Sequence, residues 1–194
     1  MTLLQIGLIL LSGFPILSTA LLAYQLLRNG QGAFGKPTIS PWLFYPAKLV
    51  AGFLLIAVFW ASAQSSFFSD FPRLVQQEIP EVQKLLALIF LLAGNLLMIP
   101  AYYSMSIFTR VGLPTKAHVL QKRGIYRISR NPMYTSFFFY FAACFLLIPS
   151  MIIAGLIFFC LIVHHFIILN EEQFLLKIFE NEYAEYRKNT PRYL

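Results

Sequence analysis

The chain has 194 residues, of which 58% are hydrophobic and only 12% are charged, and its formal net charge is +7. Soluble domains carry about a quarter charged residues, and a chain this short cannot bury so much apolar surface from water. The composition therefore excludes a soluble domain, and the many aromatic and aliphatic residues exclude disorder. We predict a protein whose apolar surface faces lipid.

Three uncharged runs in the first part of the chain are long enough to cross a bilayer, which takes roughly 20 helical residues. Met1–Leu27 lacks the basic start and cleavage site of a signal peptide, so we expect a retained span. The second run, Leu49–Ser69, follows an aromatic group typical of the membrane interface, namely Trp42, Phe44 and Tyr45. The third run is Leu85–Thr109, where Pro100 predicts a kink.

The last uncharged run, Asn131–Asn170, is 40 residues long. As one helix it would measure about 60 Å, twice what the bilayer requires. It must fold back on itself, and Pro149-Ser150 lies at its midpoint. We therefore predict an all-α integral membrane helical bundle with five transmembrane helices, the last two forming a helical hairpin.

The basic residues predict the orientation of the five spans. With this span count, the first loop, the third loop and the tail share one side of the membrane. That side would hold thirteen Lys and Arg residues, against Arg73 and Lys84 on the other: Arg28, Lys36, Lys48, Arg110, Lys116, Lys122, Arg123, Arg127, Arg130, Lys177, Arg187, Lys188 and Arg192. The positive-inside rule places the tail in the cytoplasm and the N-terminus outside. The positive net charge is then explained by residues that set the membrane orientation and contact anionic lipids, so we expect no nucleic-acid partner.

A hairpin has a consequence for the site, because its two ends return to the same membrane face. Residues 130–134 should lie close to residues 170–172, which brings an arginine, amide and phenol groups, and two carboxylates together. A structural interpretation is also open: Asn131-Pro132 has the form of a helix N-cap followed by proline at the first helical position. Arg130 and Glu171 would then end the apolar runs with their charges reaching water.

Other features of the sequence give weaker indications of function. The adjacent pair His164-His165 points in directions about 100° apart on a helix, so we expect packing or a hydrogen bond and no metal. Cys144 and Cys160 lack metal-ligand spacing. The tail from Glu171 to Lys188 predicts an amphipathic helix that lies on the membrane, covers a site or packs against the bundle. Its apolar positions recur at helical spacing: Leu175, Phe179, Tyr183 and Tyr186.

Several spaced motifs in residues 110–193 resemble the isoprenylcysteine carboxyl methyltransferase family, which belongs to a wider group with the phospholipid N-methyltransferases. They are His118-Val119-Leu120-Gln121, Gly124-Ile125-Tyr126, Arg130-Asn131-Pro132-Met133-Tyr134, Glu171-Glu172, and Phe179 followed by Glu182-Tyr183 and Tyr186. The resemblance implies a small integral-membrane methyltransferase that uses S-adenosylmethionine, in a cytoplasmic pocket formed by the third loop, the hairpin ends and the tail.

The resemblance also implies roles for individual residues. The adenine would contact His118, Val119, Leu120, Gln121 and Tyr126. The methionine part would be held by Asn131, Pro132, Met133 and Tyr134, and Glu171 would take the ribose hydroxyls or the amino group. These roles fit the chemistry, since a helix start at Pro132 suits a carboxylate, a carboxylate suits a diol or an ammonium, and a tyrosine ring suits a sulfonium.

The acceptor is less defined. We expect a lipophilic molecule at the cytoplasmic face, either similar to an isoprenylcysteine carboxylate or a lipid, that comes in from the bilayer, with Arg130 orienting an anionic group. Asn131 stands where the isoprenylcysteine enzymes typically have histidine, so the resemblance does not specify a prenylated cysteine. Residues 1–194 would form one membrane domain, with three spans in 1–109 and the catalytic region in 110–194. The alternatives are an NADPH-dependent reductase of the sterol-reductase type and a non-enzymatic scaffold or transporter.

Overall fold

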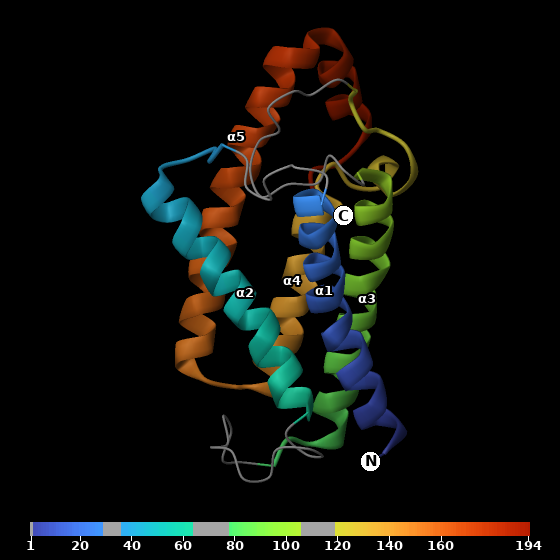
Figure 1. Cartoon of the computed structure of the whole chain (residues 1–194), viewed down its shortest axis with the longest axis vertical. Coiled ribbons are helices and arrows are strands. Elements are labelled where there is room, and N and C mark those ends of the chain that lie inside the picture. The colour runs from blue at the N-terminus through green and yellow to red at the C-terminus, as the bar shows by residue number, and fades with distance from the viewer. Residues whose placement is uncertain (1, 29–35, 64–77, 106–118) are drawn as a thin grey trace.

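A computed structural model describes residues 2–28, 36–63, 78–105 and 119–194. Within these ranges every regular element is a helix, which confirms the predicted all-α class. The five long helices run alternately up and down in Figure 1, with both ends of the α4–α5 hairpin at the upper end. The elements are α1 (Leu3–Arg28), α2 (Pro41–Ala63), α3 (Glu81–Met105), the 3-10 helix η2 (Gly124–Arg127), α4 (Pro132–Leu147) and α5 (Met151–Asn189).

Four of these helices, α1, α2, α3 and α5, are long and apolar enough to cross a membrane. The fourth predicted span, α4, has 16 residues and is a shorter apolar helix. Sixteen residues rise about 24 Å, somewhat less than the hydrocarbon core of a bilayer. The helix ends that border residues 29–40 and 106–131, together with the C-terminal part of α5, lie at one end of the molecule (Figure 1).

The predicted hairpin is confirmed, because α4 ends at Leu147 and α5 begins at Met151. The side chain of Ser150 caps α5 by accepting a hydrogen bond from the backbone nitrogen of Ile152 (3.3 Å). The turn at Pro149-Ser150 thus follows from a proline that cannot continue α4 and a serine suited to begin α5.

The start of α2 corrects one prediction. The helix begins at Pro41, eight residues before the uncharged run, and Ser40 accepts hydrogen bonds from the backbone nitrogens of Leu43 and Phe44 (both 3.0 Å). A proline at the first helical position is a common helix start. The charge of Lys48 predicts a place in the first loop, but the residue lies about two turns inside α2. Of the predicted interfacial aromatic residues, Trp42 and Tyr45 are exposed, whereas Phe44 is fully buried against the protein.

The hydrophobic core lies between α3 and α4, with α1 and α2 packed around them. Asn95 joins three helices there, since its side-chain nitrogen donates to the Leu11 carbonyl of α1 (2.9 Å) and its oxygen accepts from the Tyr140 hydroxyl of α4 (3.1 Å). Gly94 lets the Tyr140 ring approach α3 closely, because a Cβ at this position would lie 2.7 Å from a ring carbon. Small residues allow this kind of close packing between membrane helices.

We expect Gly94→Ala to lower the free energy of unfolding by about 1–3 kcal/mol, the usual cost of overpacking a well-packed core. The Tyr140 side chain is only 1% exposed and is held by Asn95, so it has little room to move. Gly52→Ala is the matched control, since nothing lies within 4 Å of its added Cβ. Thermal unfolding in mild detergent measures both variants, and equal melting temperatures would contradict the close approach.

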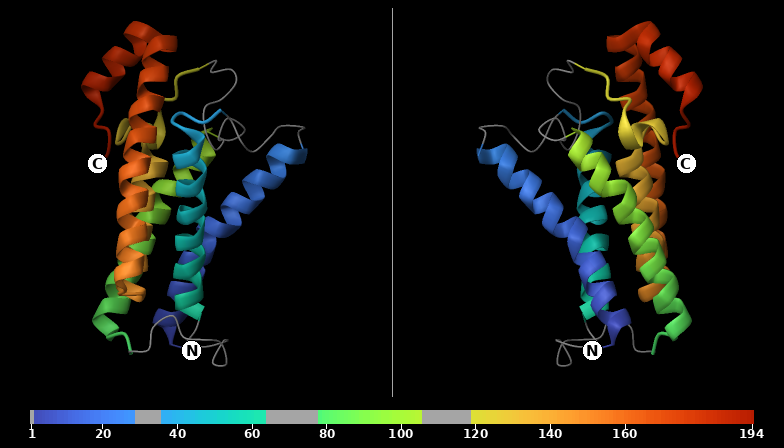
Figure 2. Two further views of the ribbon diagram at one scale, coloured as in Figure 1. Left: turned by 90° about the vertical axis from the view of Figure 1, so that its left-hand side faces the viewer. Right: turned by 90° about the vertical axis from the view of Figure 1, so that its right-hand side faces the viewer.

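The long helix α5 extends beyond the bundle and then turns back, so that the C-terminus lies beside the start of α4 (Figure 1, Figure 2). The bend is at Glu180, whose φ of 40° and ψ of −114° are not helical. The predicted tail helix is thus confirmed as a helix, continuous with the last span. Its apolar residues pack together with Leu120, which precedes η2. Of the tail residues in this cluster, Tyr183 and Tyr186 are buried, and Leu175, Leu176 and Phe179 are partly buried. Of the three predicted roles, packing is the one these contacts support.

Candidate functional site

Two groups of polar residues meet where α4 begins and α5 passes it. The first is centred on Glu172, whose side chain is only 6% exposed. Its carboxylate pairs with Arg130 (3.2 Å) and with Arg192 (3.0 Å), and it accepts a hydrogen bond from Asn131 Nδ2 (3.1 Å). We call these four residues the Glu172 clamp. The charges of Glu172 and Arg130 are buried but paired, as burial of charge requires, whereas the Arg192 side chain is partly exposed.

The clamp also holds the C-terminal tail by its backbone. Arg130 donates from its backbone nitrogen to the Pro191 carbonyl (2.9 Å) and from Nη1 to the Arg187 carbonyl (3.0 Å). Asn131 Nδ2 also donates to the Arg192 carbonyl (3.2 Å). The hydrogen bonds from Arg192 to Glu172 raise the pKa of the Arg192 guanidinium, so this cation stays charged. The tail is therefore tied to the start of α4 through both side chains and backbone.

Asn131 corrects a detail of the sequence analysis. It occupies the N-cap position of α4, and its carbonyl accepts the hydrogen bond of Thr135 N (2.9 Å), but its side chain makes no capping bond. The amide points instead to Glu172 and Arg192. Because the Asn131 amide binds Glu172 and Arg192, it does not cap α4. Within the described residues, the first N–H groups of α4 receive no side-chain cap from Asn131.

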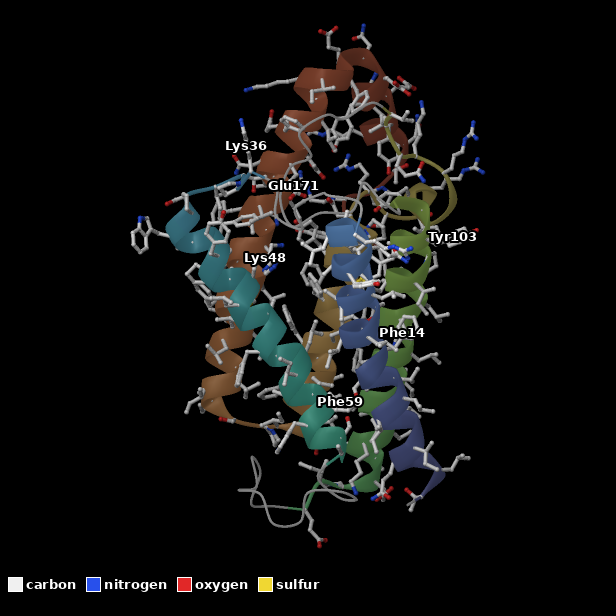
Figure 3. The ribbon with its side chains drawn as sticks, viewed as in Figure 1. Phe14, Lys36, Lys48, Phe59, Tyr103 and Glu171 are labelled. Carbon is white, nitrogen blue, oxygen red and sulfur yellow. The ribbon has the colours of Figure 1, made fainter. Side chains whose placement is uncertain are left out.

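The second group lies on the membrane side of the clamp and is centred on Tyr134, whose hydroxyl donates to Glu171 Oε1 (2.8 Å). Lys48 of α2 reaches the same hydroxyl with its ammonium nitrogen (3.5 Å), and that nitrogen lies 4.8 Å from the centre of the Tyr134 ring. Figure 3 shows Lys48 and Glu171 where α2 and α5 face each other. We call Lys48, Tyr134, His164 and Glu171 the Tyr134 cluster.

His164 completes this cluster from α5. It is only 1% exposed, and its ring centre lies 5.7 Å from that of Tyr134. Its Nδ1 is 2.8 Å from the Cys160 carbonyl, which can only accept, so Nδ1 carries the proton. Nε2 is buried and has no hydrogen-bond partner within the described residues. The sequence analysis predicted packing or a hydrogen bond for this histidine, and both are present.

The segment before α4 supplies Tyr126, which is 7% exposed and whose carbonyl accepts a hydrogen bond from Tyr186 (2.6 Å). Burial raises the pKa of Tyr126, and the neighbouring Tyr186 and Glu171 add to the rise. Its phenol therefore stays protonated and lies within electrostatic range of Glu171. Tyr126 belongs to the surroundings of the Tyr134 cluster, and its contact with the adenine stays a prediction.

The remaining predicted binding residues are more dispersed. Leu120 is buried among the tail tyrosines, Val119 is 79% exposed, and Gln121 donates to the Ser104 carbonyl of α3 (3.1 Å). His118 lies outside the described residues. Pro132 is buried at the first turn of α4, and the partly buried Met133 packs against the core.

The structure has a groove of about 510 Å³ at this end of the molecule. It lies beside the tail, and neither Tyr134 nor Glu171 lines it; the lining residues are Lys122, Arg127, Glu182, Glu185, Tyr186, Asn189 and Thr190. The predicted cofactor pocket therefore stays a prediction. Within the described ranges no group of three or more His, Cys, Asp or Glu residues could hold a metal ion, and both cysteines are free and buried.

The model of the phospholipid methyltransferase family matches residues 82–182, more than half of the chain. The chain belongs to this family. Membership implies a membrane methyltransferase, in agreement with the apolar helices. No curated protein and no solved structure matches the chain.

The phospholipid methyltransferase match covers α3, η2, α4 and α5 as far as Glu182. Tyr134, His164 and Glu171 lie inside it, whereas Lys48 on α2 and Arg192 in the tail lie outside it. Lys48 and Arg192 are members of these groups that the sequence motifs do not indicate. Ser40-Pro41 is the signal that would have placed Lys48 in a helix, but nothing local to Arg192 points to Glu172.

Proposed function

We propose that this protein is an integral-membrane methyltransferase that transfers a methyl group from S-adenosylmethionine to a lipophilic acceptor. The observation that carries the proposal is the half-buried, hydrogen-bonded pair of Tyr134 and Glu171 inside the segment that matches the family. A carboxylate in this setting is costly unless it serves a ligand or a partner. Glu171 has Tyr134 as a partner and retains further acceptor capacity, since a carboxylate can accept about four hydrogen bonds.

The donor set fits the cofactor. Glu171 can accept hydrogen bonds from a ribose diol or an ammonium. The uncapped start of α4 offers N–H groups and a positive dipole end to a carboxylate. The rings of Tyr134 and Tyr126 can face a sulfonium through a cation–π contact. When bound, S-adenosylmethionine supplies an electrophilic methyl group and leaves as S-adenosylhomocysteine.

The contribution of the chain is to align and dehydrate the two reactants. The acceptor forms a bond to the methyl carbon as the carbon–sulfur bond breaks, and the electron pair of that bond stays on sulfur. A carboxylate acceptor yields an ester and has no proton to lose, whereas an amine acceptor must first be deprotonated. Arg130 was the predicted orienting residue for an anionic acceptor, but Glu172 and the Arg187 carbonyl engage it, so we assign it to the clamp.

The sidedness is part of the proposal. Lys36, Lys48 and Glu171 lie toward the end of the molecule that holds the start of α2 and the start of α4 (Figure 1, Figure 3), and the positive-inside rule places this end in the cytoplasm with the N-terminus outside. S-adenosylmethionine would then reach the site from the cytoplasm, and the acceptor from the bilayer.

Titration of the detergent-solubilised protein with S-adenosylhomocysteine by calorimetry tests the proposal. We expect saturable binding by the wild type, and about tenfold weaker binding by Tyr134→Phe, because the lost hydroxyl orients the Glu171 carboxylate. Tyr193→Phe is the matched control, since this phenol bonds His165 at the same end of the molecule (2.7 Å) and should bind like the wild type. A folded wild type that binds NADPH and no S-adenosylhomocysteine would favour the reductase instead.

A further inference from the structure

Lys48 is an amine placed inside a membrane helix. It lies about two turns from the start of α2, among apolar residues, and is half-buried. Basic residues in the interior of membrane helices are costly, and they commonly mark a substrate or ion pathway. The contacts of Lys48 therefore bear on function.

No contact of Lys48 neutralises its charge. Its nitrogen lies 3.5 Å from the Tyr134 hydroxyl, 4.8 Å from the Tyr134 ring centre and 5.5 Å from the Phe44 ring centre. Within the described residues no carboxylate lies within the 4 Å of an ion pair, although Glu171 is close enough to act on it through space. Cation–π contacts and one long hydrogen bond leave the ammonium with donors to spare.

A second unsatisfied group lies next to the same ring. His164 Nε2 is buried without a partner in the described part of the chain, while Nδ1 is held by the Cys160 carbonyl. Buried polar groups are almost always hydrogen-bonded, so an orphaned acceptor indicates a missing donor. Lys48 and His164 thus both lie beside the Tyr134 ring. Lys48 has ammonium donors to spare, and His164 Nε2 is an acceptor with no partner in the described part of the chain.

The position of Lys48 separates it from the expected cofactor contacts. Figure 3 shows Lys48 nearer the middle of the bundle than Glu171. The neighbouring positions Tyr45 and Leu49 are exposed, Leu49 by 74%, on a helix with the composition of a membrane span. A molecule that comes from the lipid would meet Lys48 before it met Glu171.

We propose that Lys48 binds the anionic group, a phosphate or a carboxylate, of the lipophilic methyl acceptor. The assignment rests on the proposed methyltransferase function and names the residue that orients its acceptor. Because Lys48 lies outside the matched segment, the matched part of the chain supplies the cofactor contacts, and α2 supplies selectivity for the acceptor. The acceptor His164 Nε2 would take a hydrogen bond from a hydroxyl or amine of the same head, since the anionic group itself has no donor.

Ligand-induced thermal stabilisation in mild detergent tests this assignment without a known acceptor, since a ligand that binds the native state raises its melting temperature. The probes are dioleoyl phosphatidic acid, oleate and the uncharged dioleoylglycerol. We expect an anionic probe to stabilise the wild type beyond dioleoylglycerol, and Lys48→Met to bind it about tenfold more weakly. Lys48→Arg keeps the charge and should keep the stabilisation.

Lys36→Met is the matched control, because it removes the same charge from an exposed residue just before α2. Phosphatidic acid alone as the stabilising probe would identify a phosphate, and oleate alone a carboxylate. Unchanged binding by Lys48→Met, equal loss in Lys36→Met, or no stabilisation of the wild type by either anion would overturn the assignment.

Calorimetry with S-adenosylhomocysteine on the same variants separates this inference from the function on which it rests. We expect Lys48→Met to lose much less affinity for S-adenosylhomocysteine than for the anionic probe, since Lys48 contacts the cofactor pair only through the long bond to the Tyr134 hydroxyl. If Lys48→Met lost as much affinity for S-adenosylhomocysteine as for the anionic probes, Lys48 would be a cofactor-binding residue, and the assignment would be overturned. A wild type that binds no S-adenosylhomocysteine would refute the methyltransferase proposal itself.

Discussion

Glu172→Ala is expected to lower the free energy of unfolding by about 3–5 kcal/mol, the usual cost of removing one partner from a buried ion pair. The substitution leaves the Arg130 guanidinium, whose side chain is 6% exposed, without its only carboxylate among the described residues. It also releases Arg192, and with it the contacts that tie the tail to the start of α4. Thermal or denaturant unfolding in mild detergent measures the loss.

The control for this effect is a second ion pair on α5. Glu182 pairs with Lys122, but both side chains are about half exposed. Exposed pairs contribute between nothing and about 1 kcal/mol, so Glu182→Ala should change stability little. Limited proteolysis adds a local readout, since release of the clamp should expose the last residues of the chain to cleavage. Equal stability of the two variants would contradict the clamp.

Glu171→Gln is expected to weaken S-adenosylhomocysteine binding by about 100-fold and to leave the fold intact. Hydrogen bonds to a charged group contribute about 1.5–3 kcal/mol each, and a bound diol or ammonium would lose about two of them. The glutamine keeps the size of the side chain and can still accept the Tyr134 hydrogen bond. Calorimetry measures the affinity, and the melting temperature of the free protein reports the fold.

Glu185→Gln is the matched control, because Glu185 is exposed on the tail part of α5 and should bind like the wild type. The contrast with Glu172 is equally informative. If a folded Glu172→Ala protein lost all binding while Glu171→Gln bound normally, the two glutamates would have opposite roles from those proposed. The cofactor contacts proposed for Glu171 would then belong to Glu172 and the Glu172 clamp.

These two glutamates show how adjacent residues acquire different roles. Consecutive positions on a helix point about 100° apart, so Glu171 and Glu172 face different neighbours. Glu171 meets Tyr134 of α4, while Glu172 meets Arg130 and the returning tail. The motif Glu171-Glu172 contains no information about which residue meets which partner, because that depends on the rotation of α5 against α4.

The sequence by itself determined the class of the protein, its apolar helices and the hairpin, because these follow from hydrophobicity and from the thickness of the bilayer. The length of the charge-free run also brought residues 130–134 next to residues 170–172, as the bond from Tyr134 to Glu171 confirms. The family, too, was accessible from motif spacing. Each of these predictions depends on positions along the chain alone.

Only the tertiary structure decided which side chains meet. It placed Lys48 against Tyr134, directed the Asn131 side chain to Glu172 and Arg192, and brought Arg192 to Glu172. These contacts depend on how the helices are rotated about their axes and on the return of the tail after the bend at Glu180. Packing between elements distant in sequence sets those angles, and no local pattern of residues encodes them.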